Sequence, residues 1–453
     1  MKMKSMLAVA VLATFGASAA SAAVSEDEAK QLGTTLTPWG AEKAGNAEGT
    51  IPAYTGGLTT PPPGAKAGDM KLINPFPADK PLFRIDNKNK EKYKDKLSEG
   101  QLYLMERYPD TFFIDVYPTR RTAAFPKYAE EGMIYNATHA KMVGEIDGVE
   151  GAHPGVPFPI PKTGAEVQWN SNMRFRWPQM DLTFEAYLVD SAGRLNFINR
   201  SEDYFYHPFS APDKIGTPFT ARQLLHLVAP PRQNGTAVVT WNYVSYAKND
   251  ASVWIYNPGQ RRVRLAPEVS YDTPNATYGG ADFGDEGDTF YGKLDRYNWK
   301  LIGKQEMYIP ANDYDFQFHT KVADIALPGS FKTDKFRWEL RRVWVMEATL
   351  APGKRHVVAR KRFYLDEDTW NEVMWSGWDA SGKYYRTMIS PQTQDYFHPS
   401  AYTPANIVFD HSRNTVAFLA HMGCDEGCGM RSLEKPRPEN DTSPDYLLQQ
   451  GVR

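Results

Sequence analysis

Hydrophobic and polar side chains alternate with a period of two between residues 336 and 365, which is the pattern of β-strands. The chain reverses within this block at a corner formed by Pro352 and Gly353. The block therefore predicts two antiparallel strands with one apolar face. A long curved sheet with aromatic residues on its inner face can enclose a ligand. We expect the lining of such a cavity to include Trp338, Leu340, Arg342, Trp344 and Met346.

Five earlier segments also have strand-like patterns and are separated by turn sequences, so a meander is the simplest connection. They are residues 167–176, 182–189, 195–200, 237–246 and 252–265. The last of them is a hairpin with its own Pro-Gly corner and an arginine-rich second strand. Trp254 and Tyr256 of this hairpin are expected to join the cavity lining, although its register stays open. A last strand is expected at residues 383–389.

The remaining segments predict few helices and an irregular beginning. Residues 23–81 are rich in proline and glycine and indicate an extended arm. Residues 89–108 predict a helix that ends at Pro109, and a second short helix is expected around residues 136–140. We therefore expect a mainly β fold with helices, in which one large domain spans residues 82–435 and a polar tail spans residues 436–453.

The N-terminus has the three parts of an export signal. Two lysines precede an apolar run at residues 6–15, and Ala20-Ser-Ala22 supplies the small residues of a cleavage site. Residues 1–22 are thus expected to be a signal peptide, with cleavage after Ala22 or, as the second choice, after Ala23. No cysteine lies near either position, so a lipoprotein anchor is not expected. No later stretch approaches the ~20 apolar residues that span a bilayer, and a periplasmic location is favoured.

Composition adds two constraints. The chain has 25 Tyr, 23 Phe and 11 Trp, which suits a wide sheet around an apolar cavity and equally suits a large solid β core. The formal net charge of −2 provides no global field for nucleic acid or for an anionic membrane surface. We therefore expect no nucleic-acid partner.

The two cysteines, Cys424 and Cys428, are four residues apart. In an oxidising compartment this spacing predicts a small disulfide loop. A redox or metal role is disfavoured, because the spacing is not Cys-x-x-Cys and no second pair of ligands follows.

Common catalytic motifs are absent from the sequence: it has no Gly-x-Ser-x-Gly elbow, no His-Glu-x-x-His, no Walker loop and no Gly-x-Gly-x-x-Gly opening a helix. His356 lies in a predicted strand, where a structural or surface role is favoured. Asp366 and Asp368 directly follow a strand and are favoured as turn residues, although an enzyme could use such a pair. We therefore expect neither catalytic residues nor a cofactor.

An acidic loop gathers four carboxylates among glycines, which is the material of a calcium site. They belong to Asp282, Asp285, Glu286 and Asp288. Their spacing does not match an EF-hand, so a solvated acidic loop is favoured over a metal site.

Arginines cluster in the two hairpins. Arg342, Arg360 and Arg362 could reach a cavity mouth and hold an anionic head group. The favoured alternative is a solvated outer face on which arginines pair with Glu339 and Glu347.

Several motifs resemble a Gram-negative periplasmic family of unknown function whose members are labelled outer-membrane lipoprotein-sorting-like. The matching motifs include Pro157-Phe-Pro-Ile-Pro161, residues 258–264, 271–274 and 299–304, and the block from Trp338 to Trp370. The resemblance covers nearly all of the mature chain. It implies an open half-barrel, similar to the lipoprotein carriers LolA and LolB, in which a large curved antiparallel sheet holds helices on its concave side. The chain departs from LolB in its greater length and in lacking the lipobox cysteine.

The resemblance also implies a class of ligand and of partner. Half-barrels of this kind hold acyl chains, and family genes commonly lie near exporters of the resistance-nodulation-division type and outer-membrane β proteins. The leading hypothesis is a periplasmic carrier or receptor for a lipid-like ligand in an envelope transport pathway. The alternatives are an envelope enzyme acting on lipid or glycan, and a scaffold between inner- and outer-membrane partners that uses the arm and an exposed sheet edge.

Overall fold

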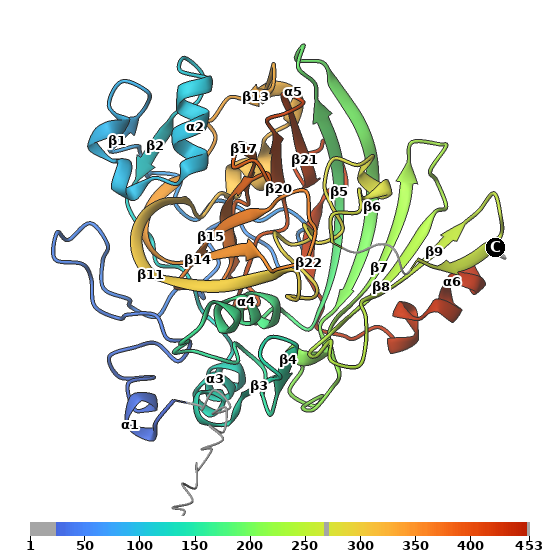
Figure 1. Ribbon diagram of the computed structural model, residues 1–453, viewed down its shortest axis with the longest axis horizontal. Coiled ribbons are helices and arrows are strands. Elements are labelled where there is room, and N and C mark those ends of the chain that lie inside the picture. Colours follow the sequence, from blue (N-terminus) through green and yellow to red (C-terminus); the bar gives the residue numbers. More distant parts are fainter. Residues whose placement is uncertain (1–23, 267–270, 451–453) are drawn as a thin grey trace, which may run out of the picture.

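One large sheet dominates the computed structural model, which describes residues 24–266 and 271–450 (Figure 1). Within these residues the sheet has 16 strands, and three separate two-stranded sheets accompany it. The prediction of a mainly β fold with helices is confirmed. The predicted signal peptide lies outside the described residues.

The first part of the sheet is an antiparallel meander in which each strand pairs with the next. Its strands are β5 (Gln179–Val189), β6 (Leu195–Tyr206), β7 (Phe219–Ala229), β8 (Ala237–Tyr243), β9 (Ser252–Asn257) and β10 (Arg262–Leu265). The predicted segments at residues 182–189, 195–200, 237–246 and 252–265 all lie in this meander. The sequence reasoning missed β7, in which apolar side chains occur on both faces and hide the period of two.

The second part is a further meander built from the C-terminal half of the chain. It contains β14 (Trp338–Leu350), β15 (Arg360–Asp366), β16 (Glu372–Trp378), β17 (Tyr384–Ile389), β20 (Asn406–Asp410) and β21 (Thr415–His421). β11 (Tyr297–Pro310) pairs along the whole of β14, and β2 (Ile114–Tyr117) joins β14 at its start. β2 also pairs with β1 (Phe83–Ile85).

The two meanders meet at β5. β21 and β22 (Gly429–Ser432) pair with successive parts of β5, so the last strands of the chain hydrogen-bond to the first strand of the earlier meander. Figure 1 shows the sheet turning through the molecule from β11 and β14 to β8 and β9. Within the described residues, β10 pairs only with β9 and β11 only with β14, so the sheet curves without closing. This confirms the expectation of an open curved sheet.

The small sheets pair β3 (Lys141–Val143) with β4 (Gly148–Glu150), β12 (Ala326–Leu327) with β13 (Ser330–Phe331), and β18 (Thr393–Asp395) with β19 (Ser400–Tyr402). The α-helices are α1 (Glu26–Ala29), α2 (Glu99–Arg107), α3 (Lys127–His139), α4 (Gly164–Met173), α5 (Val322–Ile325) and α6 (Pro444–Gln450). In the part of the chain that the structure describes, no helix has both the length and the apolar character needed to cross a membrane.

Helix α4 corrects the strand predicted at residues 167–176. Thr163 caps the helix through a reciprocal pair of hydrogen bonds with Glu166, which is a strong start signal. All ten residues of α4 are buried, polar ones included. A helix that is covered on every side does not need an apolar stripe, so its sequence lacks the helical period that would have identified it.

The helix predicted at residues 89–108 is broken. Two short 3-10 turns, η1 (Lys90–Lys92) and η2 (Lys94–Lys96), precede α2, which starts at a capping box between Ser98 and Gln101. The second predicted helix is confirmed and is longer than expected, because α3 begins at Lys127.

The C-terminal segment is not a simple polar tail. A 3-10 turn, η6 (Glu439–Thr442), and α6 pack against the first meander, and Leu447 of α6 is fully buried against Tyr204 and Tyr256. The indole nitrogen of Trp241 on β8 donates to the Thr442 carbonyl oxygen at 2.7 Å. The segment thus covers one face of β6, β8 and β9, which we call the outer face.

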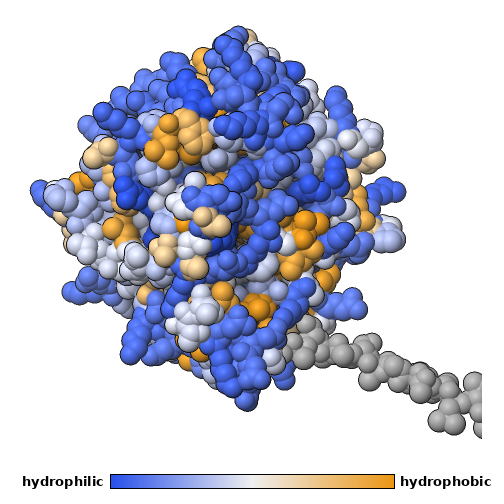
Figure 2. All heavy atoms as spheres, turned by 90° about the vertical axis from the view of Figure 1, so that its left-hand side faces the viewer, coloured by the Kyte–Doolittle hydropathy of each residue, from blue (hydrophilic) through white to orange (hydrophobic). Residues whose placement is uncertain are grey.

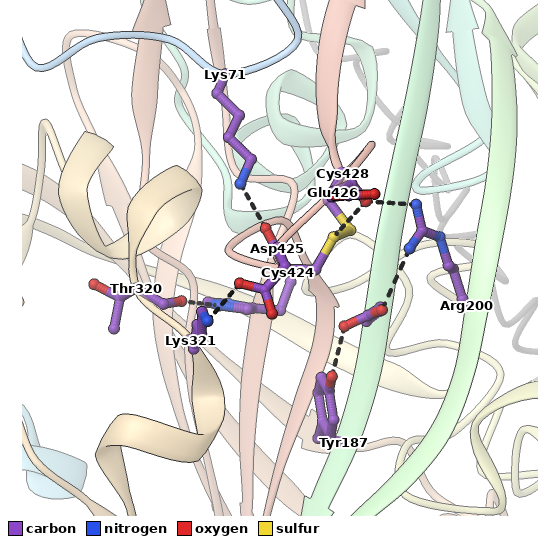
Figure 3. Close-up of a disulfide and its surroundings, with 11 residues drawn as sticks. Lys71, Tyr187, Arg200, Thr320, Lys321, Cys424, Asp425, Glu426 and Cys428 are labelled. Carbon is purple, nitrogen blue, oxygen red and sulfur yellow. Dashed lines mark hydrogen bonds and ion pairs between the residues drawn. A yellow bond between two sulfur atoms is a disulfide. The ribbon is translucent and has the colours of Figure 1, made fainter.

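Cys424 and Cys428 form a disulfide in the loop between β21 and β22, as predicted (Figure 3). The ammonium of Lys71 donates to the Cys424 carbonyl oxygen at 2.6 Å, and Arg200 donates to the Glu426 carbonyl oxygen at 2.7 Å. The loop is therefore held by the N-terminal arm on one side and by β6 on the other.

We expect Cys424→Ser to lower the free energy of unfolding by roughly 2 kcal/mol, because closing so short a loop removes little entropy from the unfolded chain. Urea denaturation measures this loss, and reductant-treated wild type should lose the same amount. Intact mass after alkylation without reductant is the control for pairing. Two free thiols in exported protein would contradict the assignment.

Candidate functional site

A cavity of about 530 Å³ lies between the first meander and the segment from Tyr271 to Lys293, which we call the covering loop. Strands β5 to β9 form its floor, on the inner face of the sheet, opposite to the outer face covered by α6. Cavities of ~300 to 1,000 Å³ are typical of sites for small molecules.

The floor is built from two neighbouring rows of directly paired residues, which point to the same side of the sheet. One row is Leu182, Asp203, Leu225, Val238 and Ile255, and the other is Met180, Phe205, Gln223, Thr240 and Val253. Seven of these ten side chains are apolar, and the polar ones sit in the middle of the rows. The floor therefore offers apolar surface around a small polar group.

The covering loop is anchored by buried ion pairs. The Asp285 carboxylate contacts the His356 imidazole at 3.0 Å and the Lys361 ammonium at 3.4 Å. Glu286 pairs with Arg386 at 2.7 Å. Burial raises the pKa of Asp285, but Lys361 and His356 outweigh burial and hold this pKa at about 2.

The expectation of a solvated acidic loop is therefore wrong. Asp282, Asp285 and Glu286 are buried, and Asp288 is half-buried between Arg174 and Arg176. The carboxylates of the loop form ion pairs with cationic side chains from distant parts of the chain. Within the described residues its carboxylates do not converge closely enough to hold one ion. The group that does converge is Glu185 with Cys424 and Cys428, whose sulfur atoms are already bonded to each other.

Two acids and a histidine that line the cavity have pKa values shifted toward their neutral forms. Burial raises the pKa of Asp203 to about 8 and that of Asp282 well above its ordinary value. Burial, with help from Arg176, lowers the pKa of His207 to about 3. The Gln223 amide donates to one oxygen of Asp203 at 2.6 Å, and the other oxygen has no hydrogen-bond partner among the described residues.

Trp254 and Tyr256, which were expected to line a cavity, lie on the other side of the sheet. Val253 and Ile255 face the cavity, so alternation turns Trp254 and Tyr256 to the outer face, where Tyr256 is buried near α6. The size of the side chains on β9 favours Trp254 and Tyr256 as cavity residues, but the sequence of this hairpin does not determine which face of the strand encloses the cavity.

The row predicted on β14 lies outside this cavity as well. Trp338 and Leu340 are buried in one packed cluster, and Met346 is buried in another. Trp344 packs against the second cluster and stacks on Trp370 with ring centroids 5.8 Å apart. These side chains contact other protein groups, and the expectation that they line the large cavity is corrected.

Two arginines of the second hairpin, Arg360 and Arg362, follow the favoured alternative. Arg360 and Arg362 pair with Glu347 at 3.3 and 2.8 Å. Arg342 departs from it, because its side chain is only 10% exposed and pairs with Glu42 and Glu367, at 3.5 and 3.7 Å.

Glu339 also pairs with arginines, as the same alternative expected. It contacts Arg337 at 2.6 Å and Arg341 at 2.8 Å, but it is fully buried where a solvated face was expected.

The candidates for an enzyme are buried in ion pairs. Asp368 pairs with Arg121 at 2.6 Å, and Asp366 contacts Arg341 at 3.4 Å. Burial, with Asp368 beside it, raises the pKa of Asp366. Neither aspartate lines the large cavity, and nor does His356. The turn predicted here is present, since the Trp370 amide donates to the Asp366 carbonyl oxygen at 2.8 Å.

Residues 84–448 match the family model described as protein of unknown function (DUF1329). The chain belongs to this family. An uncharacterized protein of Pseudomonas aeruginosa is 38% identical over 469 residues, which cover 99% of this chain and 98% of that protein. The match confirms the family resemblance drawn from the sequence motifs.

Solved structures of similar proteins align with part of the chain. A DUF1329 family protein from Desulfovibrio piger aligns with a TM-score of 0.43 and 13% identity, over 63% of this chain and 97% of that one. A putative outer membrane lipoprotein-sorting protein domain from Vibrio parahaemolyticus aligns with a TM-score of 0.40 and 13% identity, over 60% and 92%. A LolA superfamily protein from Nitrosomonas europaea aligns with a TM-score of 0.37 and 10% identity, over 63% and 100%.

Proposed function

We propose that the protein is a periplasmic carrier or receptor for a hydrophobic, lipid-like ligand in an envelope transport pathway. The observation that carries the proposal is the cavity of about 530 Å³ with a mainly apolar floor and a loop fixed over it. Each 100 Å² of apolar ligand surface buried there would contribute about 2.5 kcal/mol before the costs of binding.

On the face seen in Figure 2, apolar residues form separate patches on a hydrophilic background. The periplasmic location in the proposal rests on the export signal that the sequence predicts for residues 1–22. An exporter of the resistance-nodulation-division type and an outer-membrane β protein are the proposed partners.

Filling the cavity should abolish binding. We expect Val238→Trp to weaken the binding of a fluorescent fatty acid at least tenfold, because the indole occupies the middle of the floor. Leu265→Trp on β10 is the matched control, since Leu265 is exposed and lies outside the cavity. Fluorescence titration measures both affinities, and thermal unfolding shows whether each variant folds. Unchanged binding by folded Val238→Trp would contradict the proposal.

The natural occupant can be sought directly. Native mass spectrometry of protein purified from the periplasm should detect co-purifying lipid that Val238→Trp lacks. Consistently empty wild type that binds no apolar probe would favour a scaffold instead. Chemical change of a lipid or glycan probe during incubation would favour an enzyme.

A further inference from the structure

One end of the cavity carries more positive than negative charge. Arg174 and Arg176 both line it, and both are at least nine-tenths buried. They share one carboxylate: Asp288 contacts Arg174 at 2.7 Å and also pairs with Arg176. Burial raises the pKa of Asp288, but the two arginines outweigh burial, so the net shift is downward and Asp288 is ionised. Two cations thus face one anion.

The other ionisable groups of the cavity do not remove this excess. Asp203 is mainly protonated at neutral pH and His207 is neutral, and burial also raises the pKa of Asp282 well above its ordinary value. Lys293 pairs with Asp250, and Asp285 is engaged by Lys361 and His356.

Behind the arginines, burial raises the pKa of Glu372 to about 8, so this carboxyl is also mainly neutral at pH 7. A net charge of about +1 therefore stays at this end of the cavity.

The arginine donors are also incompletely used. Arg174 donates through its terminal nitrogens to the Ser171 carbonyl oxygen at 2.7 Å and to Asp288. Its Nε has no hydrogen-bond partner among the described residues, although the atom is buried. A buried donor without a partner is costly, so the protein itself does not fully satisfy the donors of Arg174.

The apolar floor leads away from the arginines. Arg176 precedes β5, and Met180, Leu182 and Phe184 then follow on the cavity side of that strand. At about 3.3 Å per residue, these three side chains span about 13 Å. The cavity thus combines a cationic end with an extended apolar wall.

We propose that the ligand is an amphiphile with an anionic head group, a carboxylate or a phosphate monoester, which Arg174 and Arg176 bind while the apolar chain lies along β5. This inference rests on the proposed function and names the class of its ligand. Guanidinium groups suit both anions because their donors match two oxygens at once. The anion would balance the excess charge.

The test compares four probes of equal chain length by displacement of a neutral fluorescent lipid. The probes are laurate, dodecyl phosphate, 1-dodecanol and dodecyltrimethylammonium. Both anions should bind at least tenfold tighter than the alcohol, and the cation weakest. The tighter of the two anions identifies the preferred head group. Equal affinity for all four would overturn the inference and leave the proposed function standing, whereas binding of none would overturn both.

Variants distinguish a direct role of the two arginines in anion binding from a general effect on protein stability. Arg174→Gln and Arg176→Gln should each weaken anion binding about tenfold and leave 1-dodecanol binding unchanged. Outside the cavity, Asp181 is likewise shared by two arginines, Arg431 and Arg437, so Arg431→Gln is the matched control and should change neither affinity. Equal losses for the anions and the alcohol would overturn the inference.

A gain of affinity excludes misfolding as the explanation. Asp288→Asn removes the carboxylate that competes with the ligand, so it should tighten laurate binding several-fold. Asp181→Asn is the control and should have no effect. Weaker laurate binding by folded Asp288→Asn would overturn the inference.

Discussion

Glu339→Gln is expected to lower the free energy of unfolding by about 3 to 5 kcal/mol, the usual cost of breaking a buried ion pair from one side. Glu339 is fully buried and accepts from Arg337 at 2.6 Å, from Arg341 at 2.8 Å and from Asn312 at 2.9 Å. The substitution keeps the shape of the side chain but leaves two buried guanidinium groups with less negative charge. Urea denaturation of wild type and variant measures the loss.

Glu347→Gln is the matched control on the same strand. Glu347 also pairs with two arginines, Arg360 and Arg362, but their side chains are 38% and 31% exposed. Water screens such pairs, so the loss should stay below about 1 kcal/mol. Equal losses of unfolding free energy in the two variants would show that burial does not determine how much the ion pairs of Glu339 contribute to stability.

Asp203→Asn is expected to remove a strong pH dependence of stability. Burial raises the pKa of Asp203 to about 8 in the folded protein, against roughly 3.9 in an unfolded chain. Between these values the folded state keeps a proton that the unfolded state has released. Stability therefore falls as pH rises through this range, by about 1.4 kcal/mol per pH unit from this group alone.

Urea denaturation at pH 5, 6, 7 and 8 measures the effect. The difference in stability between Asp203→Asn and wild type should grow in favour of the variant by roughly 3 kcal/mol from pH 5 to pH 7. Glu372→Gln provides a comparison, because burial also raises the pKa of Glu372 to about 8. Parallel curves for wild type and Asp203→Asn would contradict the assignment of a neutral carboxyl to the cavity floor.

The neutral state of Asp203 also bears on binding. An ionised Asp203 in the middle of the floor would repel an anionic amphiphile and would be costly to bury. A protonated Asp203 adds a polar hydrogen to an otherwise apolar row. Binding of laurate by wild type should thus weaken above pH 8, in parallel with the titration.

Local patterns in the sequence predicted eight of the 16 described strands of the main sheet, namely β5, β6, β8, β9, β10, β14, β15 and β17. The alternation in β14 and β15 and the Pro-Gly corner between them depend only on neighbouring residues, because a strand with one covered face repeats every two residues. The disulfide prediction also depended only on local information, because the four-residue separation of the cysteines and an expected oxidising compartment are enough to predict it. α4 and β7 escaped detection because their burial on several sides removes the period on which the reasoning relies.

The cavity, by contrast, depends on contacts between residues that are far apart in the chain. Whether Val253 or Trp254 faces a ligand depends on which side of the sheet α6 covers, and α6 lies almost 200 residues after β9. The sequence predicted a solvated acidic loop, because the ion-pair partners of its carboxylates come from other elements. These partners are Arg174, His356 and Arg386.

The sequence by itself determined that the chain forms a mainly β sheet and carries a disulfide, because alternation and short spacings are properties of neighbouring residues. Only the tertiary structure decided which face of the sheet encloses the cavity and which charges lie without a full set of partners there. Burial and pKa depend on what packs against a group from every direction, and a linear pattern contains only the neighbours along the chain.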